Sequence, residues 1–371
     1  MNKRLKVLFT TNIPVPYRID FYNELGKYVD LTVTFERHNA KSRDATWLGK
    51  EMTNFKGIFL KGIPIGDDIA FCPGIIKIVK DGYFDKILVG VYYSPTGILL
   101  TQYLRLTNTS YFMTGDGGFA KKDNFVKHAI KKYLNGGAKC YLITSEASMN
   151  ALASYDIPRN IMRKYLFSSL KANDLLKQVA PSEEKARLRT LLGMQERKII
   201  LCVGRLFLQK GWQDMIGISD KLGADCGVYL VGGNPKGTEF ESFIGKTPKN
   251  FHFVDFKQKN DLENYYKAAD VFVLPSRHDV WGLVVNEAMA MGLPVISTYT
   301  TVAALELVKD GENGFLYNAG NTNTLLTLLQ KLLGDDVLRH DMGEKSLIKI
   351  RPYTIENMAK TTYDIIESFK A

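Results

Sequence analysis

The chain has 371 residues, 45% hydrophobic and 24% charged, a composition that excludes a disordered protein, and its length predicts two domains because one hydrophobic core rarely serves so long a chain. Lysine and arginine outnumber aspartate and glutamate by 49 to 39, and the net charge of +10 favours anionic partners such as nucleotide diphosphates, anionic lipids or nucleic acid, unless it serves solubility alone. No membrane-spanning helix is predicted, since Tyr92 to Pro95 interrupt the apolar run from Ile87 to Leu100.

Strand-like apolar runs alternate with helical patterns in the first half of the chain, which is typical of parallel α/β units. Strands are predicted at Lys6 to Thr10, Leu31 to Phe35, Ile87 to Val91, Ser110 to Met113 and Cys140 to Thr144. Helices are predicted near Tyr17 to Leu25 and Asn124 to Asn135.

A second series of the same kind begins at Lys198. Its predicted strands are Ile199 to Val203, Gly227 to Val231, Phe251 to Val254, Val271 to Leu274 and Pro294 to Ser297. Two consecutive series predict two nucleotide-binding folds. The linker is expected near Ser169 to Leu175, before a charged, helix-prone stretch, and Pro352 to Ala371 is expected to form an amphipathic helix. The four cysteines are far apart, which indicates neither a zinc site nor a disulfide framework and favours the cytoplasm.

The most informative stretch runs from Val271 to Ser297 and reads VFVLPSRHDVWGLVVNEAMAMGLPVIS. A buried strand ends in Pro-Ser, a polar loop follows, and Gly282 opens a helix. This loop is expected at the carboxyl end of a parallel strand and at a helix amino terminus, where open α/β sheets bind ligands and unpaired N–H groups attract phosphate. Asp279 and Glu287 are predicted to face the same crevice. The alternative is that Glu287 complements the helix dipole and Asp279 caps a turn.

A second loop, within Cys202 to Gly211, reads CVGRLFLQKG. The hydrophobic strand ends at Gly204, which permits close approach of the backbone. Arg205 and Lys210 follow, and two cations at a strand's carboxyl end can neutralise a diphosphate, arginine as a planar fork and lysine as a point charge. Solvated surface charges are the alternative interpretation.

Together, the two stretches resemble glycosyltransferase family 4, the retaining glycosyltransferases of the GT-B fold. That family has a Gly-Arg loop followed by Lys-Gly, then a Pro-Ser strand end, an acidic residue, seven residues and a glutamate, with Glu-Ala-Met-Ala and Gly-Leu-Pro-Val after it. The matching residues here are Gly204, Arg205, Lys210, Gly211, Pro275, Ser276, Asp279, Glu287, Ala288, Gly292 and Pro294. The resemblance covers about Lys198 to Leu316.

The resemblance implies an α/β protein of the GT-B fold, with two Rossmann-like, doubly wound parallel-sheet domains facing a central cleft. The domains are expected at 1–172, which would bind the acceptor, and at 173–352, which would bind the nucleotide sugar. A C-terminal helix at 353–371 is expected to pack back toward the N-terminal domain.

The resemblance also implies roles for individual residues. Arg205 and Lys210 would bind the diphosphate, Glu287 the ribose hydroxyls and Asp279 the transferred sugar. Further donor contacts are expected from Gly204, Val280, the backbone N–H groups of Gly282 and Leu283, and Phe256 against the base. Asp279 departs from the family, which usually has glutamate there. Its side chain is shorter by one methylene, so the expected sugar contact would be shifted or made through water.

The functional residues of the first domain are less clearly indicated by the sequence. Thr11 to Arg18 follows the first strand and lacks the paired glycines that some relatives have there; Arg18 would meet an anionic acceptor or form a salt bridge on its own helix. Asp116, in the sequence TGDGGF, is the candidate catalytic residue of this domain, in contact with acceptor or donor sugar. A plain glycine-rich turn is the alternative.

Five lysines cluster around a short helix that contains Phe125, Val126, Ile130 and Leu134. They are Lys121, Lys122, Lys127, Lys131 and Lys132. A basic amphipathic helix is typical of contact with an anionic membrane surface. A solvated helix face would have the same pattern.

The sequence therefore predicts a retaining, hexosyltransferase-type glycosyltransferase. It would move a hexose or N-acetylhexosamine from a nucleotide diphosphate sugar, with UDP favoured, to a glycan or lipid-linked acceptor in bacterial-type surface polysaccharide or glycoconjugate synthesis. No metal and no other cofactor are expected, because no Asp-x-Asp motif occurs and two cations supply the charge. A nucleic-acid partner is not expected, and the place of work would be the cytoplasm or the inner face of the cell membrane.

Two other functions remain compatible with the sequence. The shorter Asp279 and the missing glycine pair would suit a non-catalytic, donor-binding partner subunit of another glycosyltransferase. A sugar-nucleotide epimerase can share the same two-domain fold. An NAD-dependent dehydrogenase is poorly supported, because no strand is followed by Gly-x-Gly-x-x-Gly with an acidic residue about twenty positions on.

Overall fold

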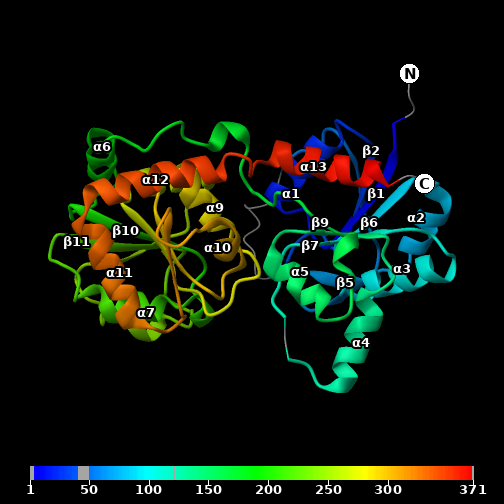
Figure 1. The fold of residues 1–371 in the computed structure, drawn as a ribbon, viewed down its shortest axis with the longest axis horizontal. Coiled ribbons are helices and arrows are strands. Elements are labelled where there is room, and N and C mark those ends of the chain that lie inside the picture. The colour runs from blue at the N-terminus through cyan, green and yellow to red at the C-terminus, as the bar shows by residue number, and fades with distance from the viewer. Residues whose placement is uncertain (1–3, 41–49, 121, 370–371) are drawn as a thin grey trace. The chain divides into compact units, whose positions relative to one another are not determined.

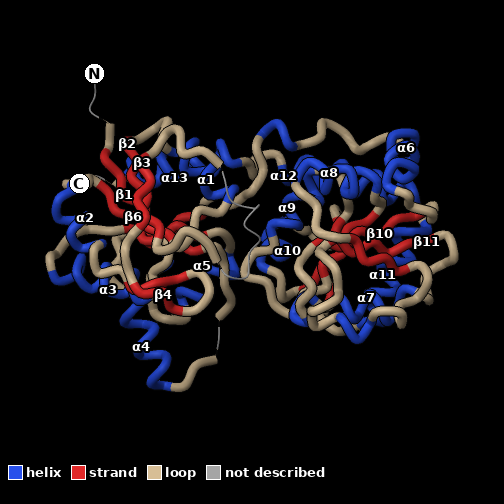
Figure 2. The backbone as a smooth tube through the Cα atoms, turned by 180° about the vertical axis from the view of Figure 1, so that it is seen from behind, coloured by secondary structure: helices blue, strands red, loops and turns tan. Residues whose placement is uncertain are grey.

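The computed structural model describes residues 4–40, 50–120 and 122–369, which form two compact units (Figure 1). The first unit contains the described residues up to Ser169 and those from Tyr353 on, and the second runs from Leu170 to Pro352. Each unit is built on a parallel sheet with helices packed against it (Figure 2). The prediction of two parallel-sheet α/β domains is therefore confirmed. Lys121 lies outside the described residues.

Within the described residues, seven parallel strands form the sheet of the first unit in the order β3-β2-β1-β6-β7-β8-β9. They are β1 (Lys6–Thr11), β2 (Asp30–Phe35), β3 (Lys56–Phe59), β6 (Lys86–Val89), β7 (Phe112–Gly115), β8 (Cys140–Ile143) and β9 (Met162–Lys164). Strand β1 pairs with β2 on one side, where Lys6 lies opposite Asp30, and with β6 on the other, where Val7 lies opposite Lys86. A short antiparallel pair, β4 (Ile63–Ile65) and β5 (Ile69–Phe71), is separate.

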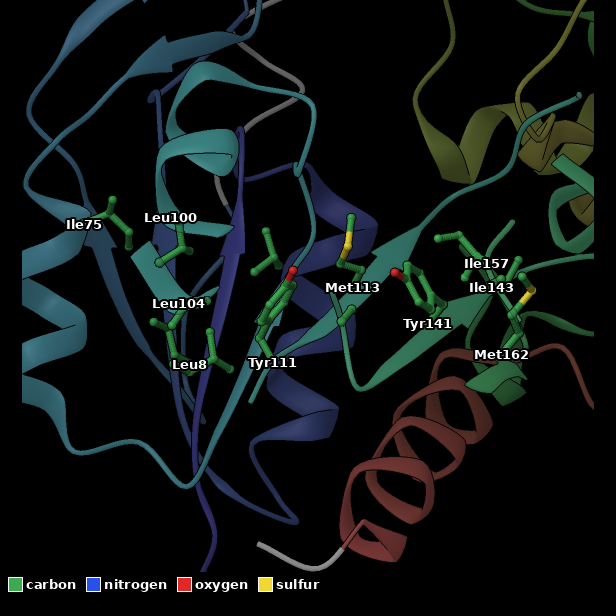
Figure 3. Close-up of a cluster of buried hydrophobic side chains, with 13 residues drawn as sticks. Leu8, Ile75, Leu100, Leu104, Tyr111, Met113, Tyr141, Ile143, Ile157 and Met162 are labelled. Carbon is green, nitrogen blue, oxygen red and sulfur yellow. The ribbon is translucent and has the colours of Figure 1, made fainter. Parts of the chain in front are cut away.

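The helices of the first unit are α1 (Pro16–Leu25), α2 (Ile75–Gly82), α3 (Pro95–Leu106), α4 (Phe125–Asn135), α5 (Glu146–Ala153) and α13 (Ile355–Ser368). Proline at the first position starts α1 and α3, and the side chains of Ser94, Asn124 and Ser145 cap α3, α4 and α5. Helix α13 packs on α1, so the end of the chain belongs to the first unit. A buried cluster from the sheet and its helices forms the core (Figure 3).

Six parallel strands form the sheet of the second unit, all of whose residues are described, in the order β12-β11-β10-β13-β14-β15. They are β10 (Lys198–Val203), β11 (Cys226–Val231), β12 (Phe251–Val254), β13 (Val271–Leu274), β14 (Val295–Thr298) and β15 (Gly314–Tyr317). Strand β13 is buried along its whole length, as expected where helices cover both faces of a parallel sheet. The order of strands reverses between β10 and β13, which pair through Leu201 and Phe272.

The helices of the second unit are α6 (Ser182–Leu192), α7 (Trp212–Ser219), α8 (Lys259–Ala268), α9 (Leu283–Ala290), α10 (Val302–Leu307), α11 (Thr322–Gly334) and α12 (Asp336–Ile350). Figures 1 and 2 show α9 and α12 on one face of the sheet and α7 and α11 on the other. Short 3₁₀ helices occur at Arg159–Ile161, Ala172–Asp174, Leu208–Lys210 and Glu241–Phe243.

The strands β3, β9 and β15 are not predicted by the sequence analysis. Strands β3 and β9 are the edges of the first sheet, and Lys56, Arg163 and Lys164 are exposed there, so neither strand has the apolar run of a buried one. Strand β15 has four residues and follows a turn. Among the described helices, none combines the length and apolar character needed to cross a lipid bilayer.

Candidate functional site

The candidate donor site lies where the strand order of the second sheet reverses. Strands β10 and β13 are neighbours there, and each runs directly into one of the two loops singled out by the sequence. Open α/β sheets bind ligands outside the carboxyl ends of the strands at this kind of reversal. The fold therefore brings together Gly204 to Gly211 and Pro275 to Gly282, two segments far apart in the chain.

Direct contacts hold the two loops together. The backbone N–H of Arg277 donates to the carbonyl oxygen of Gln209 at 2.8 Å, and the Gln209 side-chain amide donates to the carbonyl of His278 at 3.2 Å. Gly211 has a left-handed backbone (φ 75°), and a Cβ added to it would lie 2.1 Å from the carbonyl oxygen of Pro275. Only glycine allows this approach, so Gly211 fixes the position of the preceding Lys210.

Lys210 and Asp279 form an ion pair at this junction. Lys210 Nζ lies 2.5 Å from Asp279 Oδ2, and the two side chains are 22% and 14% exposed. The backbone of Asp279 is anchored on both sides, because its N–H donates to Thr300 O at 2.9 Å and its carbonyl accepts from Val302 N at 3.2 Å. Lys210, the residue predicted to bind the diphosphate, is therefore in contact with Asp279, the residue predicted to bind the transferred sugar.

Gly282 leads into α9 directly beside this pair. Its backbone is left-handed (φ 100°), no side chain caps the helix, and a Cβ added to it would lie 3.5 Å from Asp279 Oδ2. The first N–H groups of a helix have no partner within the helix. The start of α9, at Leu283, can therefore donate hydrogen bonds to an anion held by Lys210. Val280, on the same loop, is half exposed.

Arg205 is on the first loop and is exposed. Its guanidinium lies over the ring of Phe207, 4.7 Å from the ring centre, and its carbonyl accepts a hydrogen bond from Trp212 Nε1 at 3.0 Å. It forms no ion pair with a carboxylate in the described part of the chain. The structure thus brings Lys210, Asp279 and Gly282 together, and it leaves Arg205 stacked on an aromatic ring.

Glu287 lies inside α9, and Tyr266 from the end of α8 holds it. The Tyr266 hydroxyl donates to Glu287 Oε2 at 3.0 Å. Burial, and next the charge of Glu287, raise the pKa of Tyr266 well above its ordinary value, so the phenol stays protonated as a donor. Tyr266 was missed as a site residue by the sequence analysis, since a tyrosine near a helix end is an ordinary core residue.

Arg277 and Asp214 form a second, unpredicted pair behind the loops. Two hydrogen bonds of 2.6 Å join the guanidinium to the carboxylate, and the Asp214 side chain is 7% exposed. Hydrogen bonds from Arg277 to Asp214 raise the pKa of Arg277. Because Asp214 lies on α7 and Arg277 on the loop after β13, the pair holds this loop against α7. No spacing in the sequence indicates this pair.

In the first unit, Asp116 forms an ion pair with Arg18, and Tyr165 donates to the same carboxylate oxygen at 3.4 Å. Arg18 is buried, and burial opposes its charge; Asp116 together with the neighbouring tyrosines outweighs burial, so the pKa of Arg18 rises above its ordinary value. Arg18 is therefore bonded to a residue 98 positions away, and not within its own helix. Of the remaining predicted donor residues, Phe256 follows β12 and is half exposed, and Gly204 follows β10 and donates to Val231 O at 3.0 Å.

Residues 185–347 match the family model described as glycosyl transferases group 1. Sulfoquinovosyl transferase SQD2 of Arabidopsis thaliana is 30% identical over 172 residues, which are 46% of this chain and 33% of that protein. Alpha-D-kanosaminyltransferase of Streptomyces kanamyceticus is 25% identical over 225 residues, 59% of this chain and 56% of that protein. The chain thus spans between a third and rather more than half of the length of these two relatives.

Among solved structures, HepE of Anabaena in complex with UDP is similar to the whole chain. The TM-score is 0.80 at 17% identity, and the match covers 98% of this chain and 100% of HepE. At this identity the likeness shows the fold, which is the GT-B fold of glycosyltransferases. The match to the glycosyl transferases group 1 model falls within the second unit and includes both loops described above.

Proposed function

We propose that this chain is a retaining glycosyltransferase that moves a hexose or N-acetylhexosamine from a UDP-sugar to a glycan or lipid-linked acceptor. The observation that carries the proposal is the meeting of Lys210, Asp279 and the start of α9 where the second sheet reverses. A cation, a carboxylate and unpaired N–H groups are what a pyrophosphate and the adjoining sugar hydroxyls require. The complex of HepE with UDP supports the choice of base.

In this proposal, binding of the donor breaks the ion pair between Lys210 and Asp279, and each side chain then contacts the donor. The diphosphate attracts Lys210 and the first N–H groups of α9, at Gly282 and Leu283, while Asp279 turns to the hydroxyls of the transferred sugar. Arg205 supports this assignment, since its guanidinium is exposed and stacked on Phe207 instead of being bound to a carboxylate. Its planar fork suits a second phosphate.

The remaining donor contacts follow from position. Glu287, held by Tyr266, accepts hydrogen bonds from the ribose hydroxyls. Phe256 lies just beyond the carboxyl end of β12, and its half-exposed ring suits stacking against the base. Gly204 begins the first of the two loops, and Val280 follows Asp279 on the second, so both lie next to the proposed donor ligands.

The proposed chemistry needs charge stabilisation above all. The bond between the sugar and the diphosphate breaks, an acceptor hydroxyl bonds to the same carbon on the same face, and the leaving phosphate takes the acceptor's proton. Negative charge grows on the diphosphate during this step. Fixed cations and helix N–H groups stabilise such charge by roughly 2.7–4 kcal/mol for each donor, and Arg205 and Lys210 would supply it without a metal.

The acceptor would bind in the first unit. Asp116 is the proposed contact there, and its pairing with Arg18 and Tyr165 holds the carboxylate in one orientation. Contact with an anionic membrane on the cytoplasmic side is part of the same proposal. It is supported by α4, on which Phe125, Val126 and Ile130 are 87%, 63% and 53% exposed among lysines.

A screen of melting temperatures against UDP-, GDP- and TDP-sugars tests the donor proposal. A ligand at 100 times its dissociation constant stabilises the folded protein by about 2.7 kcal/mol, and each kcal/mol raises the melting temperature of a unit of this size by about 2–4 °C. We expect the UDP-sugars to give the largest shift. Equal and negligible shifts with all three classes would contradict a donor site, and an inverted anomeric configuration in the product would contradict retention.

A further inference from the structure

Helix α4 stands away from the sheet that it would normally cover. In a doubly wound unit the helix after each strand buries its apolar stripe against the sheet. Helix α4 follows β7, yet Asn135, its last residue, is the only one of its described residues that is buried. Figures 1 and 2 show the helix projecting from the first unit.

A pocket of about 320 Å³ lies between α4 and the sheet. Met113 from β7 and Tyr141 and Ile143 from β8 line it, and the same three side chains belong to the buried cluster drawn in Figure 3. Leu134 from α4 and Leu152 from α5 complete two of its walls. The pocket therefore lies against the core and is bounded on one side by the displaced helix.

Three of the polar side chains that line this pocket are already bonded to other residues of the first unit. The Tyr141 hydroxyl donates to the carbonyl oxygen of Asn135, and the Tyr155 hydroxyl donates to Asp123 Oδ2 at 2.7 Å. Lys131, which also lines the pocket, bonds to Asp123 at 2.6 Å. The lining of the pocket is mainly apolar, which suits a hydrocarbon better than a sugar, since a sugar needs hydrogen-bonding partners.

The rim of the pocket joins the proposed acceptor site. Gly115, Gly117 and Gly118, the residues around Asp116, all line it. Lys131 of α4 lines the pocket itself, and Lys122 and Lys127, just before and on α4, are exposed and form no ion pair with any described residue. A molecule with its apolar end in the pocket would thus have its polar end near Asp116 and close to positive charge.

We propose that this pocket binds the hydrocarbon chain of an anionic amphiphile, and that this amphiphile is the acceptor of the transfer. The second half of the statement rests on the proposed function; the first does not. At roughly 30 Å³ for a group the size of a water molecule, the pocket holds about ten such groups. A single chain of about ten carbons therefore fits.

Calorimetric binding of decyl phosphate, kept below its micelle concentration, tests the inference. We expect decyl phosphate to bind at least about a hundredfold more tightly than butyl phosphate, because each buried methylene adds affinity. We also expect it to bind more tightly than decyltrimethylammonium, because Lys131 lines the pocket and further lysines lie on and before α4. Equal affinity for the decyl and butyl compounds would overturn the hydrocarbon assignment. Equal affinity for the anionic and cationic decyl compounds would overturn the anionic one.

A pocket-filling variant locates the binding. Ala151 lines the pocket, whereas Ser154, on the next turn, is exposed and does not. Ala151→Trp should weaken binding of decyl phosphate at least about tenfold, since a filled pocket leaves no room for a chain. Ser154→Trp, which adds the same ring outside the pocket, should bind like the parent protein. Unchanged binding by a folded Ala151→Trp protein would place the site elsewhere.

A measurement on the parent protein avoids any folding defect of the variants. In ¹³C-methyl-methionine spectra, the signal of Met113 should shift on addition of decyl phosphate, and that of Met215, buried in the second unit, should not. UDP binding is measured on the same samples. UDP bound without a shift of Met113 overturns the pocket alone, whereas a shift of Met113 without UDP binding supports the pocket and overturns the proposed function.

Discussion

The left-handed glycine after Lys210 offers a sharp test of how the two loops meet. The change is Gly211→Ala. Gly193, at the end of α6, provides a matched control because its backbone (φ 67°, ψ 23°) is nearly that of Gly211 (φ 75°, ψ 16°). A Cβ at Gly193 would have nothing within 4 Å, whereas one at Gly211 would lie 2.1 Å from the carbonyl oxygen of Pro275.

The difference between the two variants isolates the contact between the loops. Both substitutions place alanine in the left-handed region, which costs about 1–2 kcal/mol. Gly211→Ala adds a steric overlap, and overpacking of this kind costs typically about 1–3 kcal/mol more. The protein relieves the overlap by moving Lys210 away from Pro275, so the ion pair with Asp279 opens. We therefore expect a lower melting temperature for Gly211→Ala than for Gly193→Ala.

Binding of UDP shows whether the movement matters for the donor. Loss of one charge-assisted hydrogen bond costs about 1.5–3 kcal/mol, which corresponds to roughly a ten- to hundredfold weaker affinity. Gly211→Ala should show this loss by calorimetry, and Gly193→Ala should bind UDP like the parent. If both variants melt together and bind UDP equally well, the packing of the Lys210 loop against Pro275 has no part in donor binding.

Three further outcomes are expected. Tyr266→Phe should weaken UDP binding about three- to tenfold, because the Glu287 carboxylate proposed to bind the ribose loses a hydrogen-bond donor. Pyrophosphate binding should be unchanged. Tyr265→Phe, at the buried neighbour, is the control, and equal effects of the two substitutions would refute the role of Tyr266. Burial alone would raise the pKa of Asp270, but Lys185, Arg189 and Arg339 and the backbone N–H of Ile199 together outweigh burial and lower this pKa. The stabilisation that Asp270 provides is therefore present above about pH 4 and is lost as the pH falls through the lowered value. Asp270→Asn should therefore destabilise the protein by about 3–5 kcal/mol at pH 7 and progressively less in acid, and a urea-unfolding difference independent of pH would contradict this. Ile130→Glu should reduce sedimentation with phosphatidylserine vesicles, whereas Val337→Glu, at an exposed apolar residue of the second unit, should not; equal loss would exclude α4 as the contact.

Much of the fold follows from local patterns in the sequence. The buried strands β10 and β13 are continuous apolar runs, and Gly282 marks the start of α9, so the two donor loops and their place at the carboxyl ends of strands could be predicted. The edge strands could not, because β9 reads Met-Arg-Lys and is held in the sheet by its partner β8. Its conformation depends on tertiary pairing, which no local pattern contains.

The contacts of the site depend on pairing across long distances in the chain. Lys210 and Asp279 are 69 positions apart and Arg18 and Asp116 are 98 apart. The residue types could be chosen as charged groups at strand ends, but their partners could not, because strand order decides which loops meet. Likewise, the apolar stripe of α4 predicts a helix, yet the pattern alone cannot tell that Phe125 faces outward.

A crystal structure of the chain with UDP would test the central claim most directly. We predict that the diphosphate lies within hydrogen-bonding distance of Lys210 Nζ and of the backbone N–H of Leu283, with Asp279 released from Lys210. A complex in which UDP occupies another surface and the Lys210–Asp279 ion pair stays closed would contradict the account.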